Sequence, residues 1–251
     1  MVGSKIEMSS ICLIYHSIYH NQFMQRNRLF LVGTQTIIFV GGCAILDYLR
    51  HKIPRFFIQN EDDTRNSLVE SKFKTIVVSL GNFVLSNSLL YAVFPLILQP
   101  NISTIHNNVS LEAVKLIIML IASDLLFYVT HRLLHNKHLY KHFHKMHHKH
   151  VHPISWTSFY FHPVEMIINF ANVLILPTLL FNKHPITLNL YFSILNLSLI
   201  KSHCGIDLFG IYTSKYHFVH HRLFNVNYSS ELKIWDRLFG TIYTQPIEMI
   251  H

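Results

Sequence analysis

Residues Leu111–His135 read LEAVKLIIMLIASDLLFYVTHRLLH, an apolar run that leads directly into two histidines. Its apolar part, Leu111–Val129, is long enough to cross a hydrocarbon core of about 30 Å, because a helix rises about 1.5 Å per residue. Asp124 is the one acid deep in this run. His131 and His135 are four residues apart, so on a helix they lie on one face about a turn apart. The stretch predicts a membrane helix that ends in a pair of imidazoles.

Four further apolar runs accompany this one. Leu29–Leu49 and Ile76–Leu98 are long enough to span a membrane, whereas Val164–Phe181 and Ile186–Ile200 are shorter and predict a helical hairpin. The alternative, core helices of a soluble protein, requires a polar face that the first two runs lack. We therefore expect an all-α integral membrane protein with four to five apolar helices, three of them full spans, and a histidine-rich helical cap.

The charge pattern predicts the orientation of these helices. The chain of 251 residues is half apolar and carries a formal net charge of +8. Arg50–Lys74 contains six basic residues and His131–His162 five, whereas Gln99–Ser110 contains none. Basic loops stay on the cytosolic side, so the histidine segments should face the cytosol. Basic residues between apolar runs are typical of a membrane protein and argue against nucleic acid binding.

No internal repeat or low-complexity linker divides the chain. We expect an interfacial segment at residues 1–28, with a short helix around Ile11–Tyr19, and one membrane domain at residues 29–251. The three cysteines have unrelated spacings, and no His-Glu-x-x-His sequence is present. A disulfide framework, a thiolate metal site and the zinc protease arrangement are therefore not indicated.

Histidine is the outlying residue type. The chain has 20 histidines against 13 acidic residues, and nine of them lie between His131 and His152. Two triplets share spacings of three and one: His144, His147 and His148, and then His217, His220 and His221. A single such group is usually a set of solvated side chains. Three groups at membrane boundaries indicate metal binding, and eight or more imidazoles exceed the needs of one tetrahedral zinc. The pattern predicts two metal ions.

These residues resemble the fatty acid hydroxylase and sterol desaturase superfamily over about residues 124–243. The blocks that carry the likeness are Asp124-Leu-Leu-Phe-Tyr-Val-Thr-His131-Arg-Leu-Leu-His135, His144-Lys-Met-His147-His148, His162-Pro163-Val164-Glu165, His217-Phe-Val-His220-His221, Asn227-Tyr228 and Trp235-Asp236-Arg237-Leu238-Phe239-Gly240-Thr241. The resemblance implies a di-iron centre that uses dioxygen to attack an unactivated C–H bond of a lipid. It also implies electrons from NAD(P)H through a separate cytochrome b5 type donor, and a place in the endoplasmic reticulum membrane.

The resemblance implies a set of metal ligands. They are His131, His135, His144, His147, His148, His162, His203, His217, His220 and His221. For His203 the alternative is a helix cap, and for His162 a helix-entry residue. Some relatives have a further histidine where this chain has Leu199, a place that His162 could fill. Asp124 is expected to accept a hydrogen bond from a ligand ring, or alternatively to pair with a basic residue.

The remaining residues of the pattern receive lesser roles. We expect Trp235 and Asp236 to be structural. His138, His142, His150 and His152 fit no repeated spacing and are expected at the surface or behind the ligands.

The substrate is expected to be a sterol. The blocks at His162–Glu165 and His203–Gly205 look closer to C-4 methylsterol oxidases and cholesterol 25-hydroxylase than to fatty acyl hydroxylases. A fatty acyl or sphingolipid hydroxylase and a lipid desaturase stay open, because hydroxylation and desaturation share the hydrogen-abstraction step. The alternative outside enzymes is a histidine-rich metal transporter, which would place its ligands near the middle of several spans.

Overall fold

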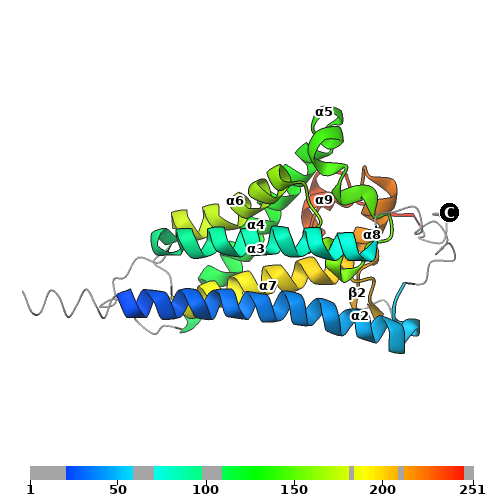
Figure 1. Cartoon of the computed structure of the whole chain (residues 1–251). Coiled ribbons are helices and arrows are strands. Elements are labelled where there is room, and N and C mark those ends of the chain that lie inside the picture. The colour runs from blue at the N-terminus through cyan, green and yellow to red at the C-terminus, as the bar shows by residue number, and fades with distance from the viewer. Residues whose placement is uncertain (1–20, 59–70, 98–108, 181–183, 209–211, 246–251) are drawn as a thin grey trace, which may run out of the picture.

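The computed structural model describes residues 21–58, 71–97, 109–180, 184–208 and 212–245, and Figure 1 shows their arrangement. The expected interfacial helix at Ile11–Tyr19 lies outside the described residues. So do residues 99–108 of Gln99–Ser110, the loop without basic residues.

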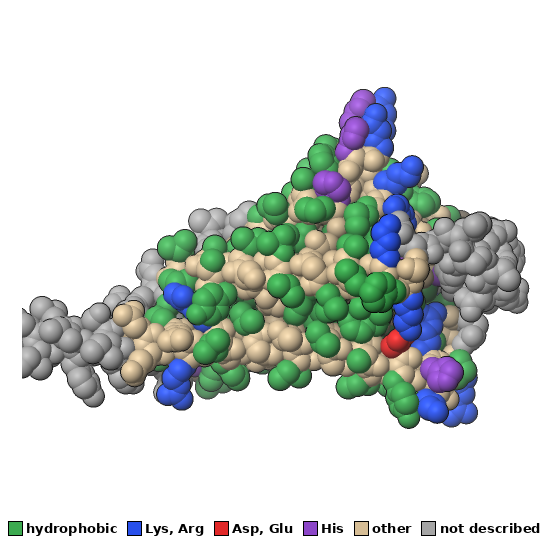
Figure 2. All heavy atoms as spheres, in the orientation of Figure 1, with side chains coloured by type: hydrophobic (Ala, Val, Ile, Leu, Met, Phe, Trp, Pro, Cys, Tyr) green, Lys and Arg blue, Asp and Glu red, His purple; other side chains and the backbone are tan. Residues whose placement is uncertain are grey.

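Three helices are long and apolar enough to cross a membrane: Asn21–Lys52, α3 (Lys72–Ile97) and α4 (Val109–Leu134). The first contains the π-helical turn η1 (Ile37–Gly41) and ends as α2 (Gly42–Lys52). In the most apolar 18-residue stretch of each helix, only 22 to 28% of the residues are buried. Figure 2 shows apolar side chains spread over the helix surface. Core helices of a soluble protein would hide such surface from water. The prediction of an all-α membrane protein with three long spans is confirmed.

The expected hairpin is formed by α6 (Pro163–Leu180) and α7 (Pro185–His203). Each helix begins with proline, whose fixed φ suits the first helical position. Each is preceded by a histidine, and the Nδ1 of His162 and of His184 accepts a hydrogen bond from the backbone N–H two residues later, at 3.2 Å in both cases. α6 packs against α3 and α4, and α7 packs against α4.

The helices pack around two apolar clusters. Near the cap, the aromatic rings of Phe39, Phe83 and Phe159 form what we call the phenylalanine layer, in which Phe39 stacks on Phe83 with ring centroids 4.4 Å apart. At the far end, a second cluster surrounds Leu188 and Tyr191, both completely buried. The large cavity described below lies between these clusters and is lined by residues of both.

The cap consists of short elements at one end of the bundle (Figure 1). They are α5 (Lys137–Leu139), η5 (Tyr140–His144), η6 (His147–Lys149), η7 (Ser155–Phe159), β1 (Asp207–Leu208), β2 (Tyr212–Thr213), α8 (Lys215–Leu223) and α9 (Ile234–Leu238). The antiparallel pair β1–β2 and an isolated antiparallel bridge between Phe57 and Ile206 depart from the expected all-helical cap. Gly205, which follows α7, has φ +75°, and a Cβ there would lie 3.2 Å from the Phe218 ring, so glycine is required.

Candidate metal centre

Two groups of imidazoles converge in the cap. Group A is His131, His135, His144, His148 and His220, and group B is His147, His203, His217 and His221. Within each group the candidate ligand atoms lie within 4.8 Å of one another. All nine rings are buried except that of His135, which is half-buried. The structure therefore brings together nine of the ten expected ligands, from α4, α7, α8 and the turns between α5 and η7.

Each later triplet contributes to both groups. On α8, His217 and His221 belong to group B and His220 to group A. Residues four apart on a helix differ by about 40° in direction, whereas neighbours differ by about 100°, so the middle histidine points elsewhere. The triplet at residues 144–148 divides in the same way, although a π turn and a 3-10 turn replace the expected continuous helix. His144 and His148 lie with His131 and His135 in group A, whereas His147 lies in group B.

The contacts of His148 indicate a shared cation in group A. Its Nε2 lies 3.0 Å from Nε2 of His144, 3.2 Å from that of His135 and 3.1 Å from that of His220. A ring nitrogen carries either one hydrogen or one lone pair, so three such contacts cannot all be hydrogen bonds. Nitrogens that share a metal at about 2.1 Å lie roughly 3.0 to 3.4 Å apart. The donor set therefore fits a metal ion.

In group B, too, ring nitrogens have more nitrogen neighbours than hydrogen bonds can explain. Nε2 of His203 lies 3.2 Å from Nε2 of His147 and 3.1 Å from that of His217, and Nε2 of His217 lies 3.1 Å from that of His221. The two central nitrogens each have two nitrogen neighbours, again more than hydrogen bonding can satisfy. Four buried nitrogens at this spacing fit a second metal ion.

The opposite ring nitrogens fix the tautomer. Three rings contact backbone carbonyl oxygens through Nδ1: His131 with Tyr228 at 2.7 Å, His220 with Val226 at 2.7 Å and His203 with Leu199 at 2.9 Å. A carbonyl only accepts, so Nδ1 carries the hydrogen and a neutral ring leaves its Nε2 lone pair free. This arrangement is typical of histidine that binds metal.

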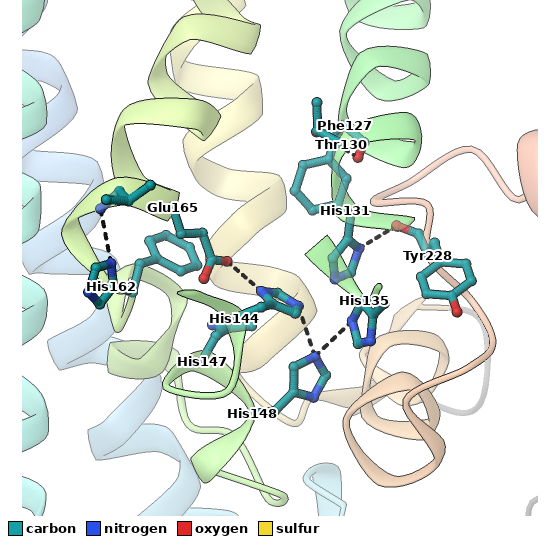
Figure 3. Close-up of polar contacts among 12 residues, drawn as sticks. Phe127, Thr130, His131, His135, His144, His147, His148, His162, Glu165 and Tyr228 are labelled. Carbon is teal, nitrogen blue, oxygen red and sulfur yellow. Dashed lines mark hydrogen bonds and ion pairs between the residues drawn. The ribbon is translucent and has the colours of Figure 1, made fainter. Parts of the chain in front are cut away.

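A carboxylate holds a fourth ring. Oε1 of Glu165, at the start of α6, lies 2.8 Å from Nδ1 of His144, and both side chains are almost completely buried (Figure 3). Glu165 lies in one of the sequence blocks that carry the family resemblance, but we expected Asp124 to accept the hydrogen bond from a ligand ring. The available signal was position: Glu165 follows a helix-starting proline in a histidine-rich segment.

Burial disfavours the charged form of the rings in groups A and B. Burial lowers the pKa of the imidazoles beyond the membrane helices, and the charges of neighbouring rings lower it further. This holds for His135, His144, His147, His148, His217 and His221, and His220 follows the same direction. Neutral imidazole is the form that binds a metal ion.

Asp124 has a role different from the expected one. Its carboxylate accepts the backbone N–H groups of Glu231 at 2.9 Å and Leu232 at 3.2 Å. It contacts neither a histidine ring nor a basic side chain among the described residues. Its position two turns before His131 places it about 10 Å along the axis from that ring, which is too far for a hydrogen bond. Asp124 anchors the segment at residues 226–232 to α4.

Asp236 holds the other side of this segment. It accepts the backbone N–H groups of Tyr228 and Ser229 at 2.9 and 2.8 Å, and the hydroxyl of Tyr216 at 2.6 Å. Burial alone would raise the pKa of the Asp236 carboxyl, but these hydrogen bonds hold it below its ordinary value. The expected structural role fits these contacts. Together Asp124 and Asp236 position the two carbonyls that orient His131 and His220.

The other histidines in the described part of the cap, and His162 at the start of α6, belong to neither group. His162 caps the start of α6, the helix-entry alternative, and belongs to neither group. His138 and His142 are exposed, whereas His150 is buried beside Thr75, with 3.2 Å between its Nε2 and the hydroxyl.

Two cavities lie on the membrane side of the histidines, and only the smaller one is lined by them. The small one, about 10 Å³, is bounded by members of both groups and has room for about one water-sized molecule. The large one, about 440 Å³, is mostly apolar and lies among the membrane helices. The residues that line both are Phe127, Phe161, Asn169, Leu199 and Ser230. An apolar molecule in the large cavity would therefore reach the edge of the metal centre.

The family model for fatty acid hydroxylase matches residues 116–241, half of the chain. This chain belongs to the fatty acid hydroxylase family. The matched region contains all nine histidines of groups A and B, so the family assignment and the geometry concern the same part of the molecule.

Members of the fatty acid hydroxylase family with curated names are similar to this chain. Fatty acid hydroxylase domain-containing protein 2 of Macaca fascicularis is 35% identical over 127 residues, 51% of this chain and 38% of the macaque protein. Methylsterol monooxygenase 2-2 of Arabidopsis thaliana is 29% identical over 82% of each chain, and sphinganine C4-monooxygenase 2 of that plant is 33% identical over 56% of this chain and 59% of its own. The matches thus span less than two thirds of two of these relatives. No solved structure matches this chain.

Proposed function

We propose that this protein is a membrane oxygenase that uses two iron ions, dioxygen and external electrons to oxidise an unactivated C–H bond of a lipid. The observation that carries the proposal is the pair of buried imidazole groups, with Nε2 contacts of 3.0 to 3.2 Å, near an apolar cavity that shares a wall with the small cavity lined by both groups. The ligands proposed are the nine histidines of groups A and B. His162 is left out of this set.

Iron is proposed because of the reaction. Bound iron would supply the redox chemistry with dioxygen that zinc, which has no accessible redox states, does not provide. An imidazole-rich site also accepts copper or zinc, so the metal is identified by measurement rather than by affinity order.

The chain's own residues supply orientation and exclusion of water. The carbonyls of Val226 and Tyr228, and the carboxylate of Glu165, hold their rings with Nε2 directed inward. Phe127 and Phe161 border both cavities, so they form part of the wall between the lipid and the metal centre. Binding a long apolar substrate in a fixed pose presents one carbon among many similar ones.

A sterol is the first substrate class proposed. A relative that matches over most of both chains is named a methylsterol monooxygenase, and the cavity of about 440 Å³ is of the size expected for a small-molecule site. A sphingolipid is the second candidate, supported by the relative named sphinganine C4-monooxygenase. Desaturation of the same lipid would use the same site.

The electron donor and the location are also proposals. We propose a separate cytochrome b5 type donor that passes electrons from NAD(P)H, and residence in the endoplasmic reticulum with groups A and B on the cytosolic side. The basic residues near the cap support this orientation (Figure 2). A metal transporter is disfavoured, because the histidines of groups A and B lie at the ends of α4 and α7 and in the cap, and not near the middle of the spans.

The test is oxidation of lipid in microsomes from a host that expresses the full chain. Microsomes are given ¹⁸O₂ and NAD(P)H, and sterols and sphingolipids are analysed by mass spectrometry. We expect a lipid that gains labelled oxygen or loses two hydrogens, dependent on both reagents. The His147→Ala and His220→Ala variants should give background, and His138→Ala, an exposed control, should retain the product. Iron-loaded wild-type protein with no such product, or full activity in either buried variant, would contradict the proposal.

A further inference from the structure

Helix α6 carries a polar stripe on its inward face. Glu165, Asn169 and Asn172 follow one another at spacings of four and three, so they lie on one side of the helix. The two outer members show where this side points. Glu165 contacts Nδ1 of His144 in group A, and Asn172 donates to the hydroxyl of Thr130 on α4. Asn169 lies between them and therefore faces the interior as well.

Asn169 lies where the large cavity meets the metal centre. It lines both cavities and follows Glu165 by one turn of α6. The small cavity has room for about one water-sized group, and its lining includes His131, His144 and His203. A group that enters this space from the large cavity therefore lies against Asn169 and against the histidine rings together.

The amide of Asn169 is open to hydrogen bonding. Its side chain forms no hydrogen bond with the residues that the structure describes, in contrast to Glu165 and Asn172 on the same stripe. Asn169 is half-buried, and packing does not seal off its amide atoms. A molecule in the cavities can therefore reach them.

The rest of the wall that the two cavities share offers little to a polar group. Three of its five members are apolar, and the hydroxyl of Ser230 already lies 3.4 Å from that of Ser198. Asn169 is thus the member of this wall whose donor and acceptor are both open.

The open amide selects a class of ligand. Its Nδ2 donates and its Oδ1 accepts, and a hydroxyl complements both because it also donates and accepts. A plain hydrocarbon that covered the amide would remove its water without replacing the hydrogen bonds, which costs free energy. A lipid that brings a hydroxyl to this point avoids that cost.

We propose that Asn169 binds a hydroxyl group of the lipid where the two cavities meet, so that the hydroxyl end of the lipid faces the metal centre. The inference rests on the proposed function in one respect, that this lipid is the substrate. The carbon presented for oxidation then lies within a few bonds of the hydroxyl. The substrate class narrows to lipid alcohols that are oxidised near their hydroxyl, and oxidation far along a plain acyl chain is disfavoured.

An ordered water held by Asn169 is the competing explanation, because buried waters satisfy open polar groups of this kind. A resident water gives no preference for an alcohol over the matching hydrocarbon. It also leaves the direction of the bound lipid unfixed. Ligand preference and ligand direction therefore separate the two explanations.

The first measurement is equilibrium binding to the purified full chain in detergent, with tritiated cholesterol as the probe. Unlabelled cholesterol is compared as a competitor with its analogue without the hydroxyl, and hexadecanol with hexadecane. We expect wild type to prefer each alcohol about tenfold, equivalent to about 1.4 kcal/mol. Asn169→Leu, which keeps a similar volume, should lose the preference and still bind the hydrocarbons.

Asn172→Leu is the matched control. Asn172 lines the large cavity but not the small one, and its Nδ2 already donates to Thr130 at 2.8 Å. This variant should keep the preference for each alcohol.

The second measurement tests the direction of the lipid. Hexadecanol with fluorine either beside the hydroxyl carbon or near the far end of the chain is bound to protein loaded with cobalt(II), a metal that imidazole sites accept. The unpaired electrons of cobalt(II) speed the relaxation of fluorine nuclei, and the effect falls steeply with distance. We expect faster relaxation at the hydroxyl end in wild type, and no such difference in Asn169→Leu.

Three results overturn the proposal: equal binding of alcohol and hydrocarbon by wild type, faster relaxation at the far end of the chain, or an unchanged preference in Asn169→Leu. Both wild-type measurements need no variant, so misfolding of Asn169→Leu does not remove the test. Neither measurement requires turnover. Absence of oxidation with the preference intact contradicts only the proposed function, whereas oxidation without the preference contradicts only the role of Asn169.

Discussion

Glu165 and His144 form a buried pair across the junction of α6 and η5, with 2.8 Å between Oε1 and Nδ1. The pair joins a helix of the membrane bundle to group A of the cap, so the position of this ring depends on how α6 packs. Because a hydrogen bond at Nδ1 leaves Nε2 directed at the other group A nitrogens, the carboxylate prepares the ring for metal binding.

The first prediction concerns this pair. Glu165→Leu removes the acceptor and should weaken metal binding by about 10- to 100-fold, because the partner of a metal-bound ring contributes on that scale. Glu165→Gln retains an acceptor oxygen and should lie closer to wild type. Metal retention is measured by dialysis of purified protein against graded chelator concentrations. If Glu165→Leu retains metal as firmly as wild type, the orienting role is wrong.

Asp124 should prove to be an anchor. In Asp124→Asn only one oxygen remains for the two backbone N–H groups of Glu231 and Leu232, so one charge-assisted hydrogen bond is lost, worth about 1.5 to 3 kcal/mol. We expect a lower melting temperature with the metal content of the folded fraction retained. Asp207→Asn, which breaks a half-buried ion pair with Lys215 outside the segment at residues 226–232, is the control and should melt closer to wild type than Asp124→Asn. Metal loss without destabilisation in Asp124→Asn would instead support the earlier expectation that it contacts a ligand ring.

His162 and His147 should behave differently although both lie in the histidine-rich region. His162→Ala removes a helix cap, which costs about 1 kcal/mol, and should leave metal content unchanged. His147→Ala removes a member of group B and should lower metal content. Elemental analysis of the two purified variants side by side tests this. Equal metal loss in both would mean that His162 binds metal in solution.

The two ends of the bundle should face opposite sides of the membrane. Lys141 is exposed in the cap and Val109 is exposed at the start of α4. Single cysteines at these positions, in a background without the native cysteines, are treated with a membrane-impermeant thiol reagent in sealed microsomes. We expect labelling at position 141 without detergent and at position 109 only with it. The reverse pattern would place the cap in the lumen.

Sequence reasoning predicted the membrane helices well, because each is a long apolar run whose ends are marked by proline or charge. α6 and α7 begin at Pro163 and Pro185, one residue before the expected runs at Val164 and Ile186. Spacing also identified the histidines that converge. The spacing did not predict how each triplet divides between groups A and B. That division depends on where the middle side chain points once α4, α7 and α8 are packed together.

The partners of the rings were harder to predict. The carbonyls of Val226 and Tyr228 have no side-chain signature, and they reach His220 and His131 only because Asp124 and Asp236 hold the intervening segment. Asn227, with φ +56°, bends the chain between the two carbonyls. Asp124 seemed suited to contact a ring because it shares a helical face with His131, but two turns separate them. Tertiary contacts of this kind are absent from a single sequence.

The central claim is that groups A and B each bind one metal ion through imidazole. Elemental analysis of full-length protein purified after iron-replete expression tests it most directly, with His220→Ala for group A and His217→Ala for group B. We expect about two iron ions per chain in wild type and about one in each variant, because an imidazole site loses affinity for its metal when one of its ligands is removed. Wild-type protein that folds with metal content near zero, or that holds a single zinc ion, would contradict the claim.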